Sequence, residues 1–418
     1  MFQNLGERAA AFLFMAAILS GCNYSTQPPA VQLGEIAFEA TGKDEAQPAF
    51  KKGMLLLHSF EYEDAAEAFH ETLDLDSNFA LAYWGIAMTC IHPLWQEQDM
   101  DKGKAILNAF APSPEARILK AATELEKDLY RGADILFGAG NKVVRDSSYA
   151  AYMKSLYEKY PGNDEVASFY SLSLIGWAIT GKQISVSEDA ANIAMEVLKR
   201  NPKHPGALHY VIHAYDHPAY AGKALEIANK YALVAPSAAH ALHMPTHTYV
   251  ALGLWDEVIS SNEVSWAASI ARMNRKQLGN DALGYHSYHW LQYGHLQKGE
   301  KERARKMLDS MRLFAKASPS GKARSHVVML LTSYLGETED YNPETVVNDF
   351  KTDDLNVGLR AAEQFVNGMY AYRQKDASVL EGIIRKMAAE RLVEADRIGE
   401  GGLRMCGNIN RSLPTETN

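Results

Sequence analysis

The chain has 418 residues, of which 47% are hydrophobic and 22% are charged, and only three are cysteines. This composition excludes a disordered chain, a disulfide-stabilised miniprotein and a polytopic membrane protein. The formal net charge of -9 comes from acidic and basic residues spread along the whole chain, so no nucleic-acid partner is expected. The histidines are unevenly distributed, because ten of the 14 lie between His204 and His295.

Residues 1–21 have the pattern of a targeting segment. Arg8 is followed by an apolar run over residues 9–19 and then by Ser20, Gly21 and Cys22. The run is about half of the ~20 residues that a membrane-spanning helix needs. The segment resembles a bacterial lipoprotein signal peptide, which implies cleavage before Cys22 and lipidation of Cys22. The residue after it, Asn23, implies an outer-membrane protein facing the periplasm, and an ordinary secretory signal is the alternative.

Residues 22–47 contain few periodic apolar positions, and we expect them to form a tether between the lipid and the folded part of the chain. Two further cysteines remain after lipidation. Cys90 lies in an apolar helical stretch, so we interpret it as a small core residue rather than a nucleophile. Cys406 has no role that the sequence assigns.

Most of the chain has the periodicity of amphipathic helices. Apolar residues recur at i, i+3, i+4 and i+7 and strand signals are scarce, so we predict an all-α protein. Asn201-Pro202 and Ala235-Pro236 end two expected helices 34 residues apart. Residues 53–75 have small, aromatic and apolar residues at the spacings of a tetratricopeptide repeat (TPR), namely Gly53, Tyr62, Ala65, Phe69, Leu73 and Leu75.

Residues 48–315 therefore resemble TPR proteins, and the resemblance implies a right-handed solenoid of antiparallel helix pairs. The segments around His58, Trp84, His209, His243 and Trp290 are similar to an uncharacterised bacterial family of exported TPR lipoproteins with a histidine-rich centre. Members of that family continue into further helix pairs after the stretch that matches 405–411. We therefore expect 316–418 to be a further helical region with incomplete C-terminal repeats.

In TPR proteins the first helix of each pair lines a concave groove. The repeat register is set without any histidine by Pro202, Ala224, Pro236, Gly253, Trp255, Gly299 and Ala304. The groove positions of three repeats are then Gly206, His209, His213, Asp216, His240, His243, His247, Val250, His286, His289, Tyr293 and Leu296. Seven of these 12 positions are histidine, against about 0.4 at the average frequency of 14 in 418.

This pattern predicts a ligand site. Residues four apart share a helix face, so His209 and His213 point together, as do His243 and His247. Stacked repeats would add a ladder of His209, His243 and His289, with the Asp216 carboxylate on the same face. Imidazoles and a carboxylate that converge from separate helices suit a transition metal. We predict a metal or other small ligand at His209, His213, Asp216, His240, His243, His247, His286 and His289.

The identity of the metal stays open among copper, zinc, iron and nickel. The chain has no His-Glu-x-x-His, Cys-x-x-Cys or Cys-x-x-Cys-His motif, so zincin, thiolate-zinc and covalent haem sites lack their usual support. His204 and His217 precede prolines and are expected at helix boundaries, and His295 lies off the groove face. No role is predicted for His58, His70, His92 and His326.

Three functions compete. The first is an envelope protein that binds a metal or small ligand in its groove, with or without catalysis, where Asp216 binds the metal or orients an imidazole. Tyr285, Tyr288 and Tyr293 would line its pocket or serve in packing. The second is a TPR scaffold for proteins or peptides, although the groove positions lack the Asn, Lys and Arg that usually grip a peptide. The third, glycan capture on aromatic side chains, does not need the histidines.

Overall fold

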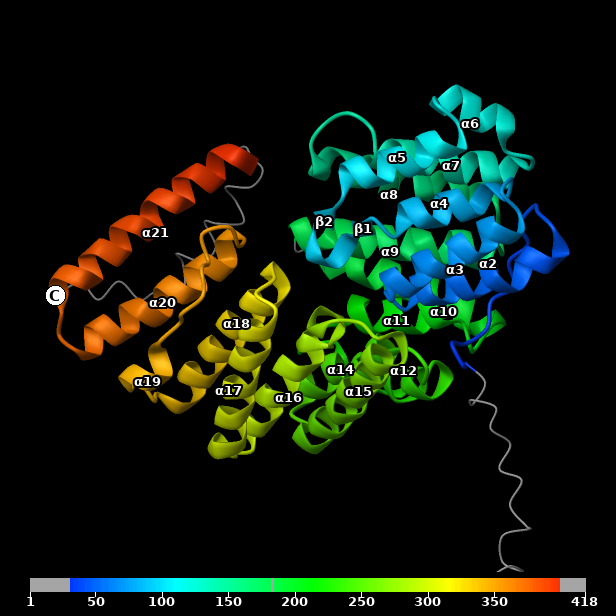
Figure 1. Cartoon of the computed structure of the whole chain (residues 1–418). Helices are drawn as coiled ribbons and strands as arrows, with labels where there is room; N and C mark the ends of the chain where they lie inside the picture. Colours follow the sequence, from blue (N-terminus) through cyan, green and yellow to red (C-terminus); the bar gives the residue numbers. More distant parts are fainter. Residues whose placement is uncertain (1–30, 182–183, 399–418) are drawn as a thin grey trace, which may run out of the picture. The chain divides into compact units, whose positions relative to one another are not determined.

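The computed structural model describes residues 31–181 and 184–398 of the chain. The expected signal peptide, Cys22 and Cys406 lie outside the described residues. Almost every described element is a helix, which confirms the all-α prediction (Figure 1). The sole paired strands in the described ranges are β1 (Ile91–His92) and β2 (Glu97–Gln98), which form a short antiparallel hairpin.

The helices follow one another in chain order with short connections. The first part of the chain contains η1 (Asp44–Ala46), α2 (Gln47–His58), α3 (Tyr62–Leu75), α4 (Ala80–Met88), η2 (Pro93–Trp95), α5 (Met100–Phe110), α6 (Pro114–Lys120), α7 (Glu124–Leu136), α8 (Lys142–Lys159), α9 (Asp164–Gly181) and α10 (Ile184–Arg200). The central part contains α11 (Pro205–Ala214), α12 (Ala221–Val234), α13 (Ala239–His243), α14 (Pro245–Leu252), α15 (Trp255–Lys276), η3 (Asn280–Ala282) and α16 (Tyr285–Gln297). The last part contains α17 (Lys301–Ala317), α18 (Gly321–Thr338), α19 (Pro343–Val346), α20 (Val357–Arg373) and α21 (Ala377–Ile398).

Consecutive helices pack as pairs, among them α2 with α3, α11 with α12 and α17 with α18. Because the connections are short, the two helices of a pair run antiparallel, as in TPR units. The packing positions predicted in the first pair are confirmed by the ring of Phe69. A Cβ atom on Gly53 would lie 2.6 Å from that ring, and one on Gly85 would lie 2.5 Å from it. Both positions therefore need glycine for α3 to approach α2 and α4.

The helix ends also follow the sequence signals. α10 ends just before Asn201 and α12 just before Ala235, as the two prolines predicted. Gly253 and Gly299 end α14 and the turn after α16 with φ values of 71° and 76°, which lie in the left-handed region that favours glycine. Gly253 and Gly299, which occupy equivalent turns, are 46 residues apart instead of 34, and the added length lies in the 22-residue helix α15.

Pro245 divides the stretch that carries three of the predicted ligands. It occupies the first turn of α14, where its missing N–H is not needed. Met244 before it keeps helical φ and ψ values of -52° and -36°. α13 and α14 therefore follow each other almost directly, and His243 and His247 remain four residues apart on one side.

The first helix pair makes long-range contacts that a linear solenoid would not make. α2 packs against α11. On α3, Asp64 forms ion pairs with Arg272 and Lys276 of α15, and the Lys276 ammonium lies 2.8 Å from the Asp64 carboxylate. The α2–α3 pair therefore covers the central helices. This arrangement differs from the expected open groove, because His209 and His243 are buried in the interior.

The apolar core has two large clusters of buried side chains. The first extends along the chain from Leu33 to Met244, and the second from Leu283 to Val366. Leu33, Phe38 and Ala46 are buried in the first cluster, so the described part of the expected 22–47 tether packs against the folded helices instead. The histidine-rich helices α11, α13, α14 and α16 lie in sequence at the end of the first cluster and the beginning of the second. No described helix combines the length and the apolar character required to cross a membrane.

Candidate metal centre

Four helices bring six of the predicted histidines together. α11 supplies His209 and His213, α13 supplies His240 and His243, α14 supplies His247 and α16 supplies His286. Neighbouring rings are separated by 4.7–5.9 Å between centroids along the series 213–209–240–243–286. We call these six residues the histidine cluster: His209, His213, His240, His243, His247 and His286.

His289 is not part of the histidine cluster, although the register placed it on the same ladder. Its Nε2 atom lies 2.8 Å from the Ser333 hydroxyl of α18. His286, three residues earlier on α16, contacts α13 instead, and its ring centroid is 4.7 Å from that of His243. The side chains of α16 are thus divided between two neighbouring helices. The predicted ladder of His209, His243 and His289 is therefore not formed.

The orientation of two buried imidazoles is fixed by hydrogen bonds from their Nδ1 atoms. His209 Nδ1 donates to the carbonyl oxygen of His58 over 2.8 Å. His243 Nδ1 donates to Asn262 Oδ1 over 2.7 Å, and the amide group of Asn262 is itself held by its 2.8 Å bond to the Val258 carbonyl. Both acceptors are oxygens without a proton, so the proton of each ring lies on Nδ1. Both Nε2 atoms therefore carry a lone pair. That of His209 lies 3.3 Å from His240 Nε2 and can accept a hydrogen bond from it, whereas that of His243 has no partner.

The carboxylate of Asp216 fixes the orientation of the His247 imidazole. Asp216 Oδ2 accepts a 2.7 Å hydrogen bond from His247 Nδ1. Such a carboxylate–histidine pair is the usual arrangement behind a metal-binding imidazole, because it fixes the tautomer and makes the second nitrogen more basic. Of the two roles predicted for Asp216, this geometry favours the one that orients an imidazole.

Three nitrogens of the histidine cluster are buried and have no hydrogen-bond partner: His213 Nε2, His243 Nε2 and His247 Nε2. An unpaired buried polar atom costs roughly 1–3 kcal/mol. For His243 and His247 the atom is the one left without a proton. Each of these two nitrogens can accept a hydrogen bond, but no donor lies within reach. A metal ligand is in the same state before the ion binds.

Burial also keeps five of the six imidazoles uncharged. Loss of solvent lowers the pKa of His209 and of His243 to about 3. The same cause, reinforced by the neighbouring imidazoles, holds the pKa of His213, His240 and His286 well below the ordinary 6.5. At neutral pH these rings are therefore neutral, and the neutral imidazole is the form that binds a metal.

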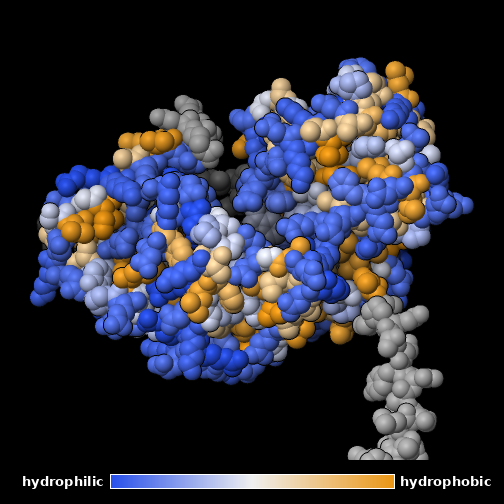
Figure 2. Space-filling view, viewed as in Figure 1, coloured by the Kyte–Doolittle hydropathy of each residue, from blue (hydrophilic) through white to orange (hydrophobic). Residues whose placement is uncertain are grey.

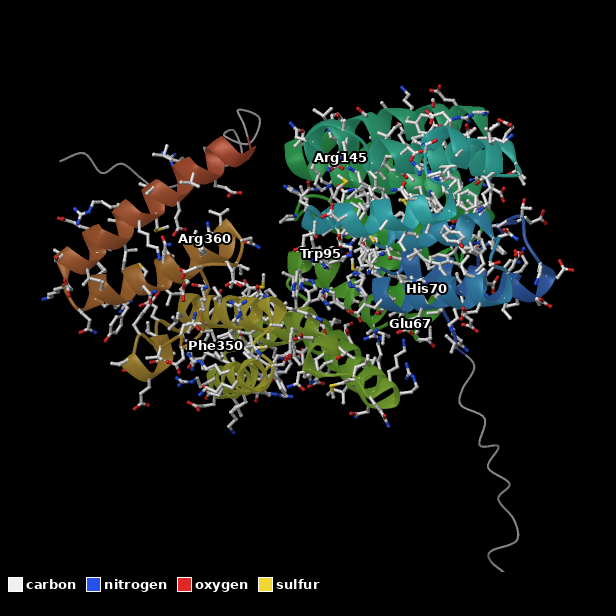
Figure 3. The ribbon with its side chains drawn as sticks, turned by 45° about the horizontal axis from the view of Figure 1, so that its top comes forward. Glu67, His70, Trp95, Arg145, Phe350 and Arg360 are labelled. Carbon is white, nitrogen blue, oxygen red and sulfur yellow. The ribbon has the colours of Figure 1, made fainter. Side chains whose placement is uncertain are left out.

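Aromatic side chains lie against the histidine cluster on more than one side. The Phe60 ring lies 4.2 Å from His209, and the Trp290 ring lies 4.5 Å from His247. Phe60 has a φ of 56°, a conformation that is costly for a non-glycine residue and that is often found at functional sites. The Trp95 ring, labelled in Figure 3, lies 6.0 Å from His240.

The enclosure is incomplete. His213, His240 and His286 are half-buried, so solvent and ions can reach the cluster from their side. Phe60 also lines an apolar cavity together with Tyr62, Phe169 and Trp177. The centre therefore has one solvent-accessible side and one side that adjoins an apolar cavity.

A second histidine group was not predicted. His58 Nε2 lies 2.7 Å from Glu165 Oε2, and His204 Nε2 lies 3.1 Å from Glu165 Oε1. All three side chains are buried. Burial alone would raise the pKa of Glu165, but the two imidazoles reverse this effect and lower it. Tyr210 supplies a further contact, with its hydroxyl 2.9 Å from His58 Nδ1.

The hydrogen bonds of this second group are complete. His204 Nδ1 accepts from the backbone N–H of Ala207, which confirms the predicted helix-boundary role of His204 as the N-cap of α11. Its Nε2–H is thus free to donate to Glu165. Tyr210 can donate to His58 Nδ1, which leaves His58 Nε2–H to donate to the other carboxylate oxygen. Although the three side chains could hold a metal, they are satisfied without one.

The remaining predicted residues have structural contacts. Tyr285 and Tyr288 belong to the second core cluster, and Tyr293 lies edge-on to Trp255. His295 lies off the cluster, as predicted, with Nδ1 2.9 Å from Glu300. Cys90 is buried, in agreement with its interpretation as a core residue.

Comparisons with known proteins find no matching family model and no matching curated protein. Solved structures similar to the chain include yeast Tom70, with 10% identity over 84% of this chain and 88% of that chain and a TM-score of 0.35. The Naa15/Naa10 complex bound to HypK-THB has 15% identity over 88% and 64% of the two chains and a TM-score of 0.29. The TPR domain of P58(IPK) has 12% identity over 79% and 99% and a TM-score of 0.21.

Proposed function

We propose that this protein is a TPR-like helical scaffold that binds a first-row transition metal at the histidine cluster. One observation supports this proposal above the others: His243 and His247 each donate from Nδ1 to an oxygen, while their Nε2 atoms are buried without a partner. Packing alone would not select this arrangement, because it leaves acceptor atoms unpaired in the interior.

The residues present fit an imidazole-preferring ion. The donors are neutral imidazoles without any thiolate, which suits copper, zinc, iron or nickel. Asp216 would orient His247 and supply a negative charge near the ion. When bound, such an ion would act as a Lewis acid or, for copper or iron, as a redox centre.

The test is elemental analysis of the protein purified without an affinity tag, before and after incubation with each metal. The unaltered protein should contain a stoichiometric transition metal. The double variant His209→Ala/His243→Ala should lose it, whereas His289→Ala, whose ring contacts Ser333, should retain it. Circular dichroism checks that each variant keeps its helices. Less than a tenth of an equivalent of any metal in the reconstituted, unaltered protein would contradict the proposal.

We further propose that the protein is exported and lipid-anchored at Cys22, at the outer membrane facing the periplasm. The support is the sequence Leu19-Ser20-Gly21-Cys22 after a short apolar run. Labelling of cells with radioactive palmitate should mark the protein, and Cys22→Ser should abolish the label. An unaltered protein that carries no label would contradict the lipid anchor.

A second candidate function is the binding of a protein partner by the last helix pair. Six large apolar side chains on α20 and α21 are exposed: Phe365, Tyr372, Val379, Ile384, Leu392 and Val393. Figure 2 shows apolar residues among hydrophilic ones in this part of the surface. Exposed apolar residues grouped on one pair of helices are typical of interaction surfaces. Val379→Glu should weaken such an interaction without loss of helix, and an unchanged interaction profile in crosslinking experiments would contradict this function.

A further inference from the structure

The histidine cluster divides into two sets of three. In the first set are His209 and His213 of α11 and His240 of α13, and their donor nitrogens all lie within 4.8 Å of one another. The second set consists of His243 of α13, His247 of α14 and His286 of α16, whose donor atoms meet the same limit. Consecutive turns of α13 thus point one histidine into each set.

The spacing within the first set fits two ligands on one ion. His209 Nε2 and His240 Nε2 lie 3.3 Å apart, where one ring can donate a hydrogen bond to the other, and an ion that binds both nitrogens would replace that bond. Two nitrogens at about 2.0–2.1 Å from a tetrahedral metal are separated by roughly 3.3–3.4 Å. The Nδ1 atom of His209 is occupied by the His58 carbonyl, so Nε2 is the nitrogen available for an ion.

In the second set, two ligand nitrogens have no partner at all. His243 and His247 have their Nδ1 atoms bonded to Asn262 and Asp216, and both Nε2 atoms are buried and unpaired. His286 completes the set, with its ring 4.7 Å from His243. Each set also has its own aromatic wall, because Phe60 lies against His209 and Trp290 lies against His247.

The two sets adjoin each other. His213 of the first set and His247 of the second have ring centroids 5.1 Å apart. Asp216 lies beside this pair, and its carboxylate forms a third close group with the same two imidazoles. A carboxylate at this point offsets the repulsion between two neighbouring cations. Two-metal sites in proteins hold their ions about 3.5–4 Å apart, and adjacent sets of ligands are what such a site needs.

We propose that the centre holds two first-row transition-metal ions, one on each set of three histidines, with Asp216 beside both. This inference rests on the metal binding proposed above and adds its stoichiometry and ligand sets. Three imidazoles leave each ion a further coordination position for water or another small ligand.

The test is the metal stoichiometry of the full chain, stripped of metal and titrated with Zn²⁺ or Cu²⁺. The unaltered protein should bind two ions per chain. His240→Ala, in the first set, and His286→Ala, in the second, should each bind one. The matched control is His289→Ala, three residues from His286 on the same helix, which should still bind two.

The outcomes separate this inference from the proposed function. One ion in the unaltered protein, lost in either variant, would overturn the two-ion centre and leave metal binding intact. No ion at all would overturn both. If a variant does not fold, electron paramagnetic resonance of the unaltered protein loaded with Cu²⁺ tests whether the two ions are adjacent. Two adjacent Cu²⁺ ions should show coupled spins, and a full, uncoupled signal from both ions would contradict their adjacency.

Discussion

Asp216 and Asn262 decide which nitrogen of the neighbouring histidine is available. Each accepts a 2.7 Å hydrogen bond from an Nδ1 atom, on His247 and His243 respectively. Each thereby leaves the Nε2 lone pair directed into a space without hydrogen-bond donors. At the scale of single residues, the chemistry of the centre is thus determined as much by these two acceptors as by the histidines themselves.

The first prediction concerns Asp216→Asn. The asparagine oxygen can still accept from His247, but the negative charge is lost, so His247 becomes a poorer ligand. We expect the metal affinity to fall by roughly 10–100-fold while the stoichiometry is retained. Competition with a chromophoric chelator measures this change. Asp256→Asn, which alters an exposed ion pair with Lys298, serves as the control. Loss of a whole equivalent would instead make Asp216 a metal ligand.

The second prediction concerns Glu165→Gln. The buried carboxylate accepts from both His58 and His204, whereas a glutamine places an amide N–H against one of these N–H donors. We expect the free energy of unfolding to fall by about 1–3 kcal/mol with no change in metal content. Urea unfolding monitored by circular dichroism measures it.

The comparison for Glu165→Gln is Glu188→Gln, which changes an exposed partner of Lys223 and should leave stability almost unchanged. A loss of bound metal in the Glu165 variant would show that the second histidine group, rather than the cluster, holds an ion. That result would contradict the assignment of the metal to the imidazoles that lack hydrogen-bond partners.

The sequence predicted part of this residue-level picture. Pairs four apart on one helix, such as His209 with His213, were assigned correctly to one side because local geometry determines it. His286 and His289 both fell on predicted groove positions, but α16 lies between two neighbours and only His286 reaches the cluster. The second histidine group was not predicted, because Glu165 lies 107 residues from His58 and 39 residues from His204 in the chain.

At the scale of elements, the cluster depends on the close approach of α2 and α11. Gly206 makes this approach possible, because a Cβ atom there would lie 2.3 Å from His58 Nδ1. The same helix end supplies the His58 carbonyl that holds His209. The contact between the two helices therefore connects the buried Glu165 group with the histidine cluster.

The third prediction is that Gly206→Ala pushes α2 away from α11. Overpacking of this kind costs about 1–3 kcal/mol in the free energy of unfolding. Metal affinity should fall as well, because the His58 carbonyl moves with its helix. Thermal unfolding and chelator competition on the same sample measure both effects.

Gly222→Ala is the matched control for the helix contact. A Cβ atom at Gly222 on α12 would meet nothing within 4 Å, so alanine should be neutral or stabilise the protein by up to about 1 kcal/mol. If both alanine variants behaved alike, the close approach at Gly206 would not be a constraint on the fold.

Helix ends could be predicted from the sequence, but the docking of distant helices could not. Pro236 and Gly253 act locally, through backbone conformation, and the helices end where these residues require. The ion pairs that join α3 to α15 connect residues 208 and 212 positions apart in the chain. Nothing in local periodicity indicates that Asp64 meets Arg272, so the covering of the histidines by the first helix pair was not foreseen.

At the scale of the whole molecule, the stability of the metal-free protein should depend on pH. Burial lowers the pKa of His209 and His243 to about 3, below the ordinary value of 6.5. Below pH 6.5 the unfolded chain therefore binds more protons than the folded chain. Protons then favour the unfolded state, and stability that is fully present above pH 6.5 is lost as the pH falls toward 3.

The fourth prediction follows from this difference in proton binding. Between pH 8 and pH 5, His209 and His243 should each remove roughly 2 kcal/mol from the free energy of unfolding of the metal-free protein. Urea unfolding at a series of pH values measures the slope, and His209→Gln, which cannot titrate, should make it shallower. With metal bound, the protein should be more stable at pH 7, because the ion binds only the folded chain. It should also lose stability more steeply on acidification, because protons displace the ion from the imidazoles. A metal-free protein equally stable at pH 8 and pH 5 would mean that the imidazoles accept protons freely in the folded state, and the buried, neutral cluster on which metal binding depends would then not exist.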